Sequence, residues 1–278
     1  MEKKATSPAP AKAAAPKKKS AGGLNPILVI PILLVIGILS YEYICGDSSH
    51  FVDGNHEKGP KNGDYFGIVY EGGPIVPLLF TCFLTVLVFS IERFFIIGRA
   101  NGAGSIDEFV SKIKSLLDKN DVEAAVKECD KQKGSVGNVV KTALHKFVEL
   151  RTETELTKDQ KLAALQKEIE EATSLELPML EKNLTIIATL ASVSTLTALL
   201  GTVLGMIRAF AAMGNTGAPD TGALATGISE ALVNTALGIG TAAIATVMYS
   251  YFTSRIDTLT YKIDEIGLSI QQNFSAHN

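Results

Sequence analysis

The chain has 278 residues, of which 46% are hydrophobic and 20% charged, and its net charge at pH 7 is −3. This balance excludes the strongly basic surface of a nucleic-acid-binding protein. The three cysteines, Cys45, Cys82 and Cys129, have no metal-ligand spacing, and we expect neither a disulfide nor a metal site from them.

The apolar residues lie in blocks of about 20, the length that crosses ~30 Å of hydrocarbon as a helix. We therefore predict an all-α, polytopic membrane protein whose long helices extend into a cytoplasmic helical domain. Residues 1–23 are rich in Ala, Pro and Lys and are predicted to form a disordered, basic cytoplasmic tail.

Residues 24–44 contain the run ILVIPILLVIGIL, which we interpret as a retained transmembrane helix. A cleaved signal peptide is the alternative, but the stretch YEY at 41–43 occupies the place of a small-x-small cleavage site. The lysines at 17–19 then place the N-terminus in the cytoplasm by the positive-inside rule.

Residues 45–74 are polar and Gly-rich and are predicted to be a periplasmic loop. His50 and His56 lie in it near Asp53 and Glu57. These four side chains could bind a metal, but histidines in a flexible acidic loop are interpreted as solvated.

Residues 75–98 form the second predicted span, which ends at the charged pair Glu92-Arg93, interpreted as an interfacial anchor. Residues 99–183 are amphipathic and are predicted to form the cytoplasmic helical domain. Capping boxes that begin at Ser105 and Thr157 mark helix starts within it. Apart from Pro178, no breaker separates the last of these helices from the next apolar run, so we expect one very long helix entering the membrane.

Residues 184–213 and 223–253 are two further spans, joined by a periplasmic turn at 214–222. Residues 254–278 alternate charged and apolar residues at helical spacing and are predicted to continue as a cytoplasmic C-terminal helix. Both termini are thus expected in the cytoplasm of a multi-pass protein. Most basic residues near the spans lie on the predicted cytoplasmic side, but Arg208 lies toward the outer end of its span. Its side chain should extend to the outer surface or face a polar interior.

Glu230 is the single acid within these two apolar segments. An ionisable group inside a span costs ~2.5–3.5 kcal/mol on insertion scales, so it normally faces protein or water and serves function. Thr226, Asn234 and Thr241 lie within about 40° of Glu230 around a helix, whereas Thr235 lies about 140° away. Glu230 therefore has a polar stripe, which Asn234 supports, and Thr235 faces a different neighbour.

The preceding span carries Gly201 and Gly205 in a GxxxG pattern that permits close helix packing, with Thr202 between them. A Ser or Thr here can simply bond its own helix carbonyl. Taken with Glu230, however, the polar series favours an interior that water or ions can reach. The sequence has no phosphate loop, HExxH, GxSxG or zinc spacing, so we predict neither an enzyme nor a cofactor.

The chain resembles the ExbB/TolQ/MotA proton-channel family, most closely its ExbB branch. The resemblance covers roughly residues 75–260 and is specific in the segments LLGTVLGM at 199–206 and GISEAL at 227–232. The chain departs from the family at Thr195 and Ala198, where Pro and Gly are usual, and in its additional N-terminal span and loop.

The resemblance implies that Thr202 and Thr235 line a pore and that Glu230 is the intramembrane glutamate of a proton or ion pathway. It implies a homopentamer in the lipid of a bacterial inner membrane, surrounding the single-span helices of an ExbD-type partner. Such a motor would use the proton motive force to energise a TonB-type protein and outer-membrane transport.

Three alternatives remain open at this point. A TolQ-like stator for envelope integrity, or a gliding or flagellar stator, belongs to the same broad class. A secondary transporter would have an internal repeat and spans broken at the midplane. In a purely structural membrane scaffold, Glu230 would only bond a neighbouring helix.

Overall fold

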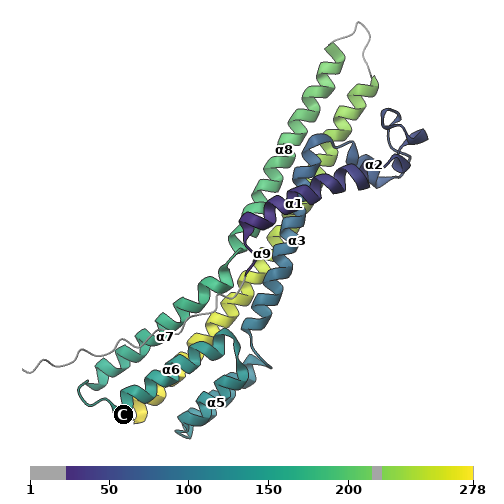
Figure 1. Ribbon diagram of the computed structural model, residues 1–278. Helices are drawn as coiled ribbons and strands as arrows, with labels where there is room; N and C mark the ends of the chain where they lie inside the picture. Colours follow the sequence, from purple (N-terminus) through teal and green to yellow (C-terminus); the bar gives the residue numbers. More distant parts are fainter. Residues whose placement is uncertain (1–22, 215–220, 278) are drawn as a thin grey trace, which may run out of the picture.

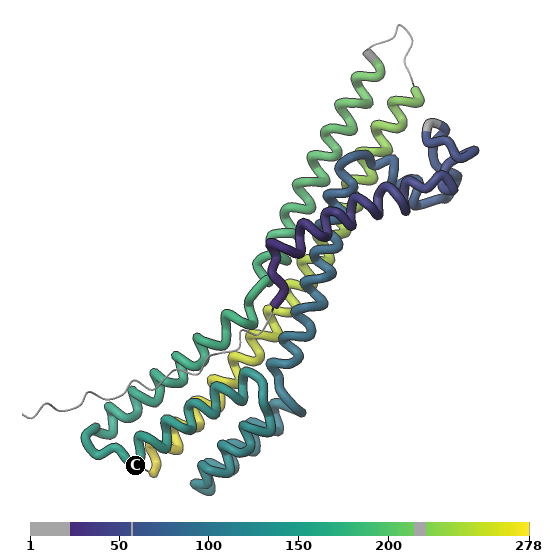
Figure 2. Tube along the Cα trace, in the orientation of Figure 1, coloured from purple at the N-terminus to yellow at the C-terminus, as the bar shows by residue number. Residues whose placement is uncertain are grey.

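A computed structural model describes residues 23–214 and 221–277 (Figures 1 and 2). The described residues are almost entirely helical, and four helical stretches are long and apolar enough to cross a membrane. The prediction of an all-α polytopic membrane protein is confirmed. Residues 1–22 of the predicted tail and residues 215–220 of the predicted turn lie outside the described residues.

The main helices follow in chain order. They are α1 (Pro26–Ser40), α2 (Tyr65–Tyr70), α3 (Val76–Ala100), α4 (Ile106–Asp118), α5 (Val122–Gln132), α6 (Gly134–Thr152), α7 (Lys158–Glu181), α8 (Leu184–Gly214) and α9 (Thr221–His277). A π-helical turn, Tyr41–Cys45, extends α1, and short 3₁₀ turns lie between it and α3.

The molecule is elongated, and α9 runs along its whole length (Figure 1). At 57 residues α9 measures about 85 Å. Its first half pairs with α8 and its second half packs against α4, α6 and α7. The main apolar core lies in that second half, where Phe147 and Phe274 are fully buried.

Local sequence signals explain where the smaller helices begin. Thr157 forms a complete capping box with Gln160, as its sequence predicts. Ser105 precedes α4 as expected, but its side chain makes no capping hydrogen bond, so this predicted box is wrong. Asp121 caps α5 by accepting a hydrogen bond from the Ala124 N–H at 3.0 Å.

The expected single long helix does not form, because the chain breaks at Lys182 and Asn183 between α7 and α8 (Figure 2). Asn183 has a φ of 63°, a left-handed conformation that Asn tolerates better than most residues. The Arg93 guanidinium donates to the carbonyls of Met179 and Leu180 at 3.2 and 3.4 Å. These carbonyls belong to the last turn of α7. Carbonyls at a helix end have no N–H donor within their own helix, so Arg93 supplies one.

The Glu92 carboxylate completes this contact from the same turn of α3. It accepts hydrogen bonds from the Asn183 side-chain amide at 2.9 Å and from the Leu24 N–H at 2.5 Å. We call Glu92, Arg93 and Asn183 the joint. Arg93 is fully buried, so the interpretation of Glu92-Arg93 as an interfacial anchor misses its main role.

Residues 41–73 form a folded cap rather than a flexible loop. Tyr41 and Tyr70 stack with ring centroids 4.7 Å apart, and Phe51 is 1% exposed beneath them. His50 Nδ1 lies 2.8 Å from the Asp64 carboxylate, which lowers the pKa of that acid. His56 Nε2 lies 3.0 Å from the Gly46 carbonyl, so both histidines have partners within the cap.

Candidate functional site

The α8–α9 hairpin is held together by small residues at the helix contact. A Cβ atom on Gly201 would lie 2.7 Å from Asn234 Cγ, and one on Gly205 would lie 2.8 Å from the Gly227 carbonyl oxygen. The two helices therefore approach as closely as backbone atoms allow. This approach sets an antiparallel register in which facing residues lie at nearly equal distances from the turn.

Glu230 lies inside this hairpin and is 5% exposed. Its Oε1 atom accepts a hydrogen bond from Arg208 Nη1, so the two side chains form an ion pair between α8 and α9. The Arg208 side chain is 52% exposed, whereas that of Glu230 is 6% exposed. The buried acid is thus neutralised by a cation that itself remains half outside.

The turn that precedes α3 covers the Glu230 carboxylate. Gly73 has a φ of +74°, and a Cβ atom there would lie 2.5 Å from Glu230 Oε1. The backbone conformation favours glycine at this position, and a larger residue would also displace the Glu230 carboxylate. The cap and the Glu230 site are therefore in direct contact.

Asn234 fixes this turn against α9. It is completely buried and its Nδ2 donates to the Gly72 carbonyl at 2.8 Å. Its Oδ1 accepts no hydrogen bond from the part of the chain that the structure describes. The Asn234 side chain thus supports the Glu230 site by holding the turn at Gly72 and Gly73 that covers the carboxylate.

Thr202 and Thr235 face each other across the hairpin, with their Oγ1 atoms 2.5 Å apart. Each hydroxyl also lies 3.0 Å from a carbonyl one turn back, that of Ala198 for Thr202 and that of Ala231 for Thr235. Both side chains are half-buried. The different neighbour expected for Thr235 is thus Thr202 of the same chain.

Only part of the polar stripe predicted around Glu230 is buried together. Thr241 is buried on the same face of α9 as Glu230 and Asn234, and its hydroxyl donates to the Leu237 carbonyl at 2.8 Å. Thr226 is exposed near the start of α9 and donates to the Gly222 carbonyl at 3.1 Å. Thr226 therefore does not belong with the buried set.

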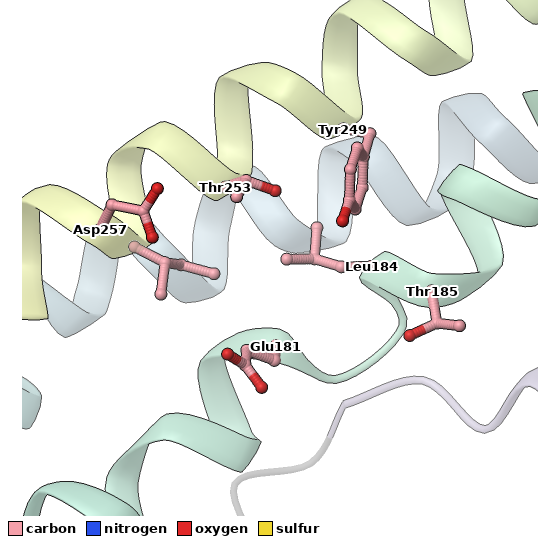
Figure 3. A pocket seen from close by; sticks show the side chains of 7 residues that line it. Glu181, Leu184, Thr185, Tyr249, Thr253 and Asp257 are labelled. Atoms are coloured by element: carbon pink, nitrogen blue, oxygen red, sulfur yellow. The ribbon is translucent and has the colours of Figure 1, made fainter.

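A separate polar hollow of about 250 Å³ lies at the other end of the α8 helix, beside the break between α7 and α8 (Figure 3). Glu181 contributes a carboxylate to it from α7 and Asp257 contributes one from α9, and three hydroxyl groups also line it. The hydroxyl groups belong to Thr185, Tyr249 and Thr253. We call the line of contact between α8 and α9 the seam. It carries polar groups at the Glu230 end, at the hollow beside Glu181 and Asp257, and at Thr202 and Thr235 in between.

Sequence reasoning missed the partner of Glu230, although it singled out Arg208 as exceptional. The available signal is the hairpin register, since Arg208 and Glu230 lie at nearly equal distances from the turn, as do Thr202 and Thr235. Reasoning from a helical wheel places residues around one helix and says nothing about the facing one.

Residues 132–265 match a family described as the MotA/TolQ/ExbB proton channel family. Glu230, Arg208, Thr202 and Thr235 all lie within the matched range, whereas the cap, α1 and α3 lie outside it.

Three curated relatives show the extent of the similarity. An ExbB-like biopolymer transport protein of Synechocystis is 44% identical over 84 residues, which are 30% of this chain and 40% of the relative. An ExbB homolog of Methanothermobacter thermautotrophicus is 26% identical over 209 residues, 74% of this chain and 69% of the relative. The Tol-Pal system protein TolQ of Pseudomonas aeruginosa is 24% identical over 196 residues, 70% of this chain and 85% of the relative.

Proposed function

Because the chain carries a domain of the MotA/TolQ/ExbB proton channel family, we propose that it is the ExbB-like scaffold subunit of a proton-driven motor in a bacterial inner membrane. With an ExbD-type partner, the motor would couple the proton motive force to a TonB-type protein and outer-membrane transport. The similarity to ExbB-named relatives supports the ExbB branch.

The observation that carries this proposal is the buried carboxylate of Glu230 between apolar helices. Burying an acid and pairing it with Arg208 is expensive compared with an apolar contact, and ionisable residues within spans usually mark ion or proton pathways. Protonation of Glu230 removes its negative charge and therefore the attraction that holds Arg208. In this proposal Glu230 carries the proton, and Arg208 pairs with the Glu230 carboxylate while that carboxylate is ionised.

The polar groups along the seam extend the path in one direction. From Glu230 the seam passes Thr202 and Thr235, whose hydroxyls can both donate and accept, and reaches the hollow between Glu181 and Asp257. Asn234 and the glycines Gly201 and Gly205 keep the helices and the covering turn in place. One charge crossing 100 mV releases about 2.3 kcal/mol, which is enough to drive such a step.

The apolar part of the hairpin supplies one carboxylate per chain, so the complete path needs further acids, and we propose that copies of the chain and an ExbD-type partner contribute to it. An apolar stripe on α8 supports helix contacts of this kind. Its exposed members are Leu196, Leu199, Val203, Ile207 and Phe210. We propose that a pentamer of chains covers part of such faces and that lipid covers the rest.

A TolQ-like stator is the second candidate, favoured by the similarity to TolQ of Pseudomonas aeruginosa over 85% of that protein. The other two alternatives fit less well. The break at Lys182 and Asn183 lies at the end of α8 rather than within it, unlike the midplane breaks of secondary transporters. A structural scaffold would contain no proton path at all.

The proposal is tested by proton flux into liposomes that hold the purified chain, with and without an ExbD-type protein from the same organism. We expect a flux driven by membrane potential only when both proteins are present, together with a co-purified assembly. Potential-driven flux that is equal with and without the partner, or absent in both cases, would contradict the motor. A TolR-type protein in place of the ExbD-type one separates the two stator candidates.

Thr202 provides a prediction about the middle of the path. Thr202→Val keeps the shape of the side chain but removes the hydroxyl, and we expect it to reduce the proton flux about tenfold, as for one lost hydrogen bond of ~1.4 kcal/mol. Thr202→Ser keeps the hydroxyl and should retain most of the flux. Equal flux in the Val and Ser variants would show that the hydroxyl only bonds its own helix.

A further inference from the structure

The cap ends directly over the Glu230 site, and its last turn is held there by three contacts. Asn234 Nδ2 donates to the Gly72 carbonyl, the Gly73 backbone lies against the Glu230 carboxylate, and Ser229 Oγ donates to Glu71 Oε2 at 3.3 Å. The third contact brings a second carboxylate next to the residue that precedes Glu230 on α9.

Glu71 differs from Glu230 in its surroundings. It is half-buried, and among the described residues it forms no ion pair, whereas Glu230 is paired with Arg208. Burial raises the pKa of the Glu71 carboxyl, and the Ser229 hydrogen bond offsets part of that rise. A half-buried acid without a cation can gain and lose a proton without breaking an ion pair.

We propose that Glu71 is a second proton-carrying carboxylate, which collects protons at the cap side of the membrane and passes them to Glu230. The proposal rests on the proposed function of Glu230. A hydronium ion gives a proton to the Glu71 carboxylate and becomes water. Glu71 then gives the proton up toward the Glu230 carboxylate through the Ser229 hydroxyl or a water molecule, which accepts one proton as it passes another on. Glu71 returns to its ionised form, and Glu230 becomes neutral.

The cap lies outside the matched family range, so this role belongs to the additional N-terminal part of the chain. A merely structural reading is that Glu71 fastens the cap to α9. A Gln at position 71 distinguishes the two roles. Its side-chain oxygen accepts the Ser229 hydrogen bond, so it can fasten the cap, but it cannot carry a proton.

The test measures proton flux in liposomes that contain the full assembly with its partner. Glu71→Gln is expected to lower the flux about 100-fold, the lower end of the range for a lost general acid–base group. Glu71→Asp should keep most of the flux. Glu42→Gln, an exposed acid of the same cap, is the matched control and should behave as wild type.

A mobile buffer gives a measurement that a structural role would not change. A membrane-impermeant weak acid such as MES, added on both sides, should restore flux in Glu71→Gln by supplying protons to the cap end of the path in place of Glu71. It should not restore flux in Glu230→Gln. Wild-type flux in Glu71→Gln, or a loss that neither buffer nor Asp restores, would overturn the role of Glu71.

Ser229→Ala keeps the proposal testable if Glu71→Gln does not assemble. It should lower the flux severalfold, and the double variant should be no slower than Glu71→Gln alone, because both act on one step. Additive losses would place the two residues on separate paths and contradict the proposal. Wild-type flux in Glu230→Gln would instead contradict the proposed function itself.

Discussion

Glu230→Gln is expected to reduce the potential-driven proton flux of the assembly at least ~100-fold, because the group that carries the proton is lost while the shape of the side chain is kept. Gln is uncharged and nearly isosteric, so the Gly73 turn and the α8–α9 contact should remain in place. The expected loss is therefore one of function and not of folding. Flux in liposomes, driven by an imposed potential, measures it directly.

Two comparisons make this result specific. Glu171→Gln removes an exposed acid of α7 that is paired with Lys167 and should leave the flux unchanged. The purified Glu230→Gln assembly should retain the subunit composition and melting temperature of the wild type. Normal flux in Glu230→Gln would mean that the buried ion pair with Arg208 is only structural, as in the scaffold alternative.

Arg93→Met is expected to have the largest effect on stability, lowering the free energy of unfolding by about 3–5 kcal/mol, the usual cost of breaking a buried ion pair from one side. Methionine has similar length but no donor, so the Met179 and Leu180 carbonyls at the end of α7 lose their partner. Glu92 would also lose the guanidinium 3.1 Å away. Thermal unfolding of the detergent-purified protein, followed by circular dichroism, measures the change.

Arg99→Met provides the control, because Arg99 lies on the same helix six residues further on and is exposed. Its substitution should leave the melting temperature within a few degrees of wild type, as for most surface changes of ~0.5 kcal/mol or less. If Arg93→Met and Arg99→Met unfolded at the same temperature, the joint would not be the stabilising contact described above.

Much of the membrane architecture could be predicted because its signals are local. The apolar runs at 184–213 and 223–253 are long enough to identify spans, and the cost of burying Glu230 marks it as exceptional within them. The Thr157 capping box likewise depends on residues three apart. Local signals are still not always sufficient, because Ser105 precedes α4 without making the capping hydrogen bond that its sequence predicts.

The missed features depend on residues that are distant in sequence. The break at Asn183 is supported by Arg93 and Glu92, about 90 residues away, so no local pattern marks it. The aromatic centre of the cap has no single helical or strand periodicity, because Tyr41, Phe51 and Tyr70 come from a π-helical turn, a loop position and the end of α2. Periodicity identifies faces of regular elements but not cores assembled from loops.

The unbroken course of α9 and the break between α7 and α8 give the two arms of the hairpin different mechanical properties. A continuous helix transmits axial rotation along its length, so a turn of α9 at Glu230 would be delivered to the core around Phe274, more than 40 residues further on. The other arm can tilt at Asn183 without turning α7. The hairpin therefore combines one continuous arm with one broken arm, and the break is held against α3 through Arg93 and Glu92.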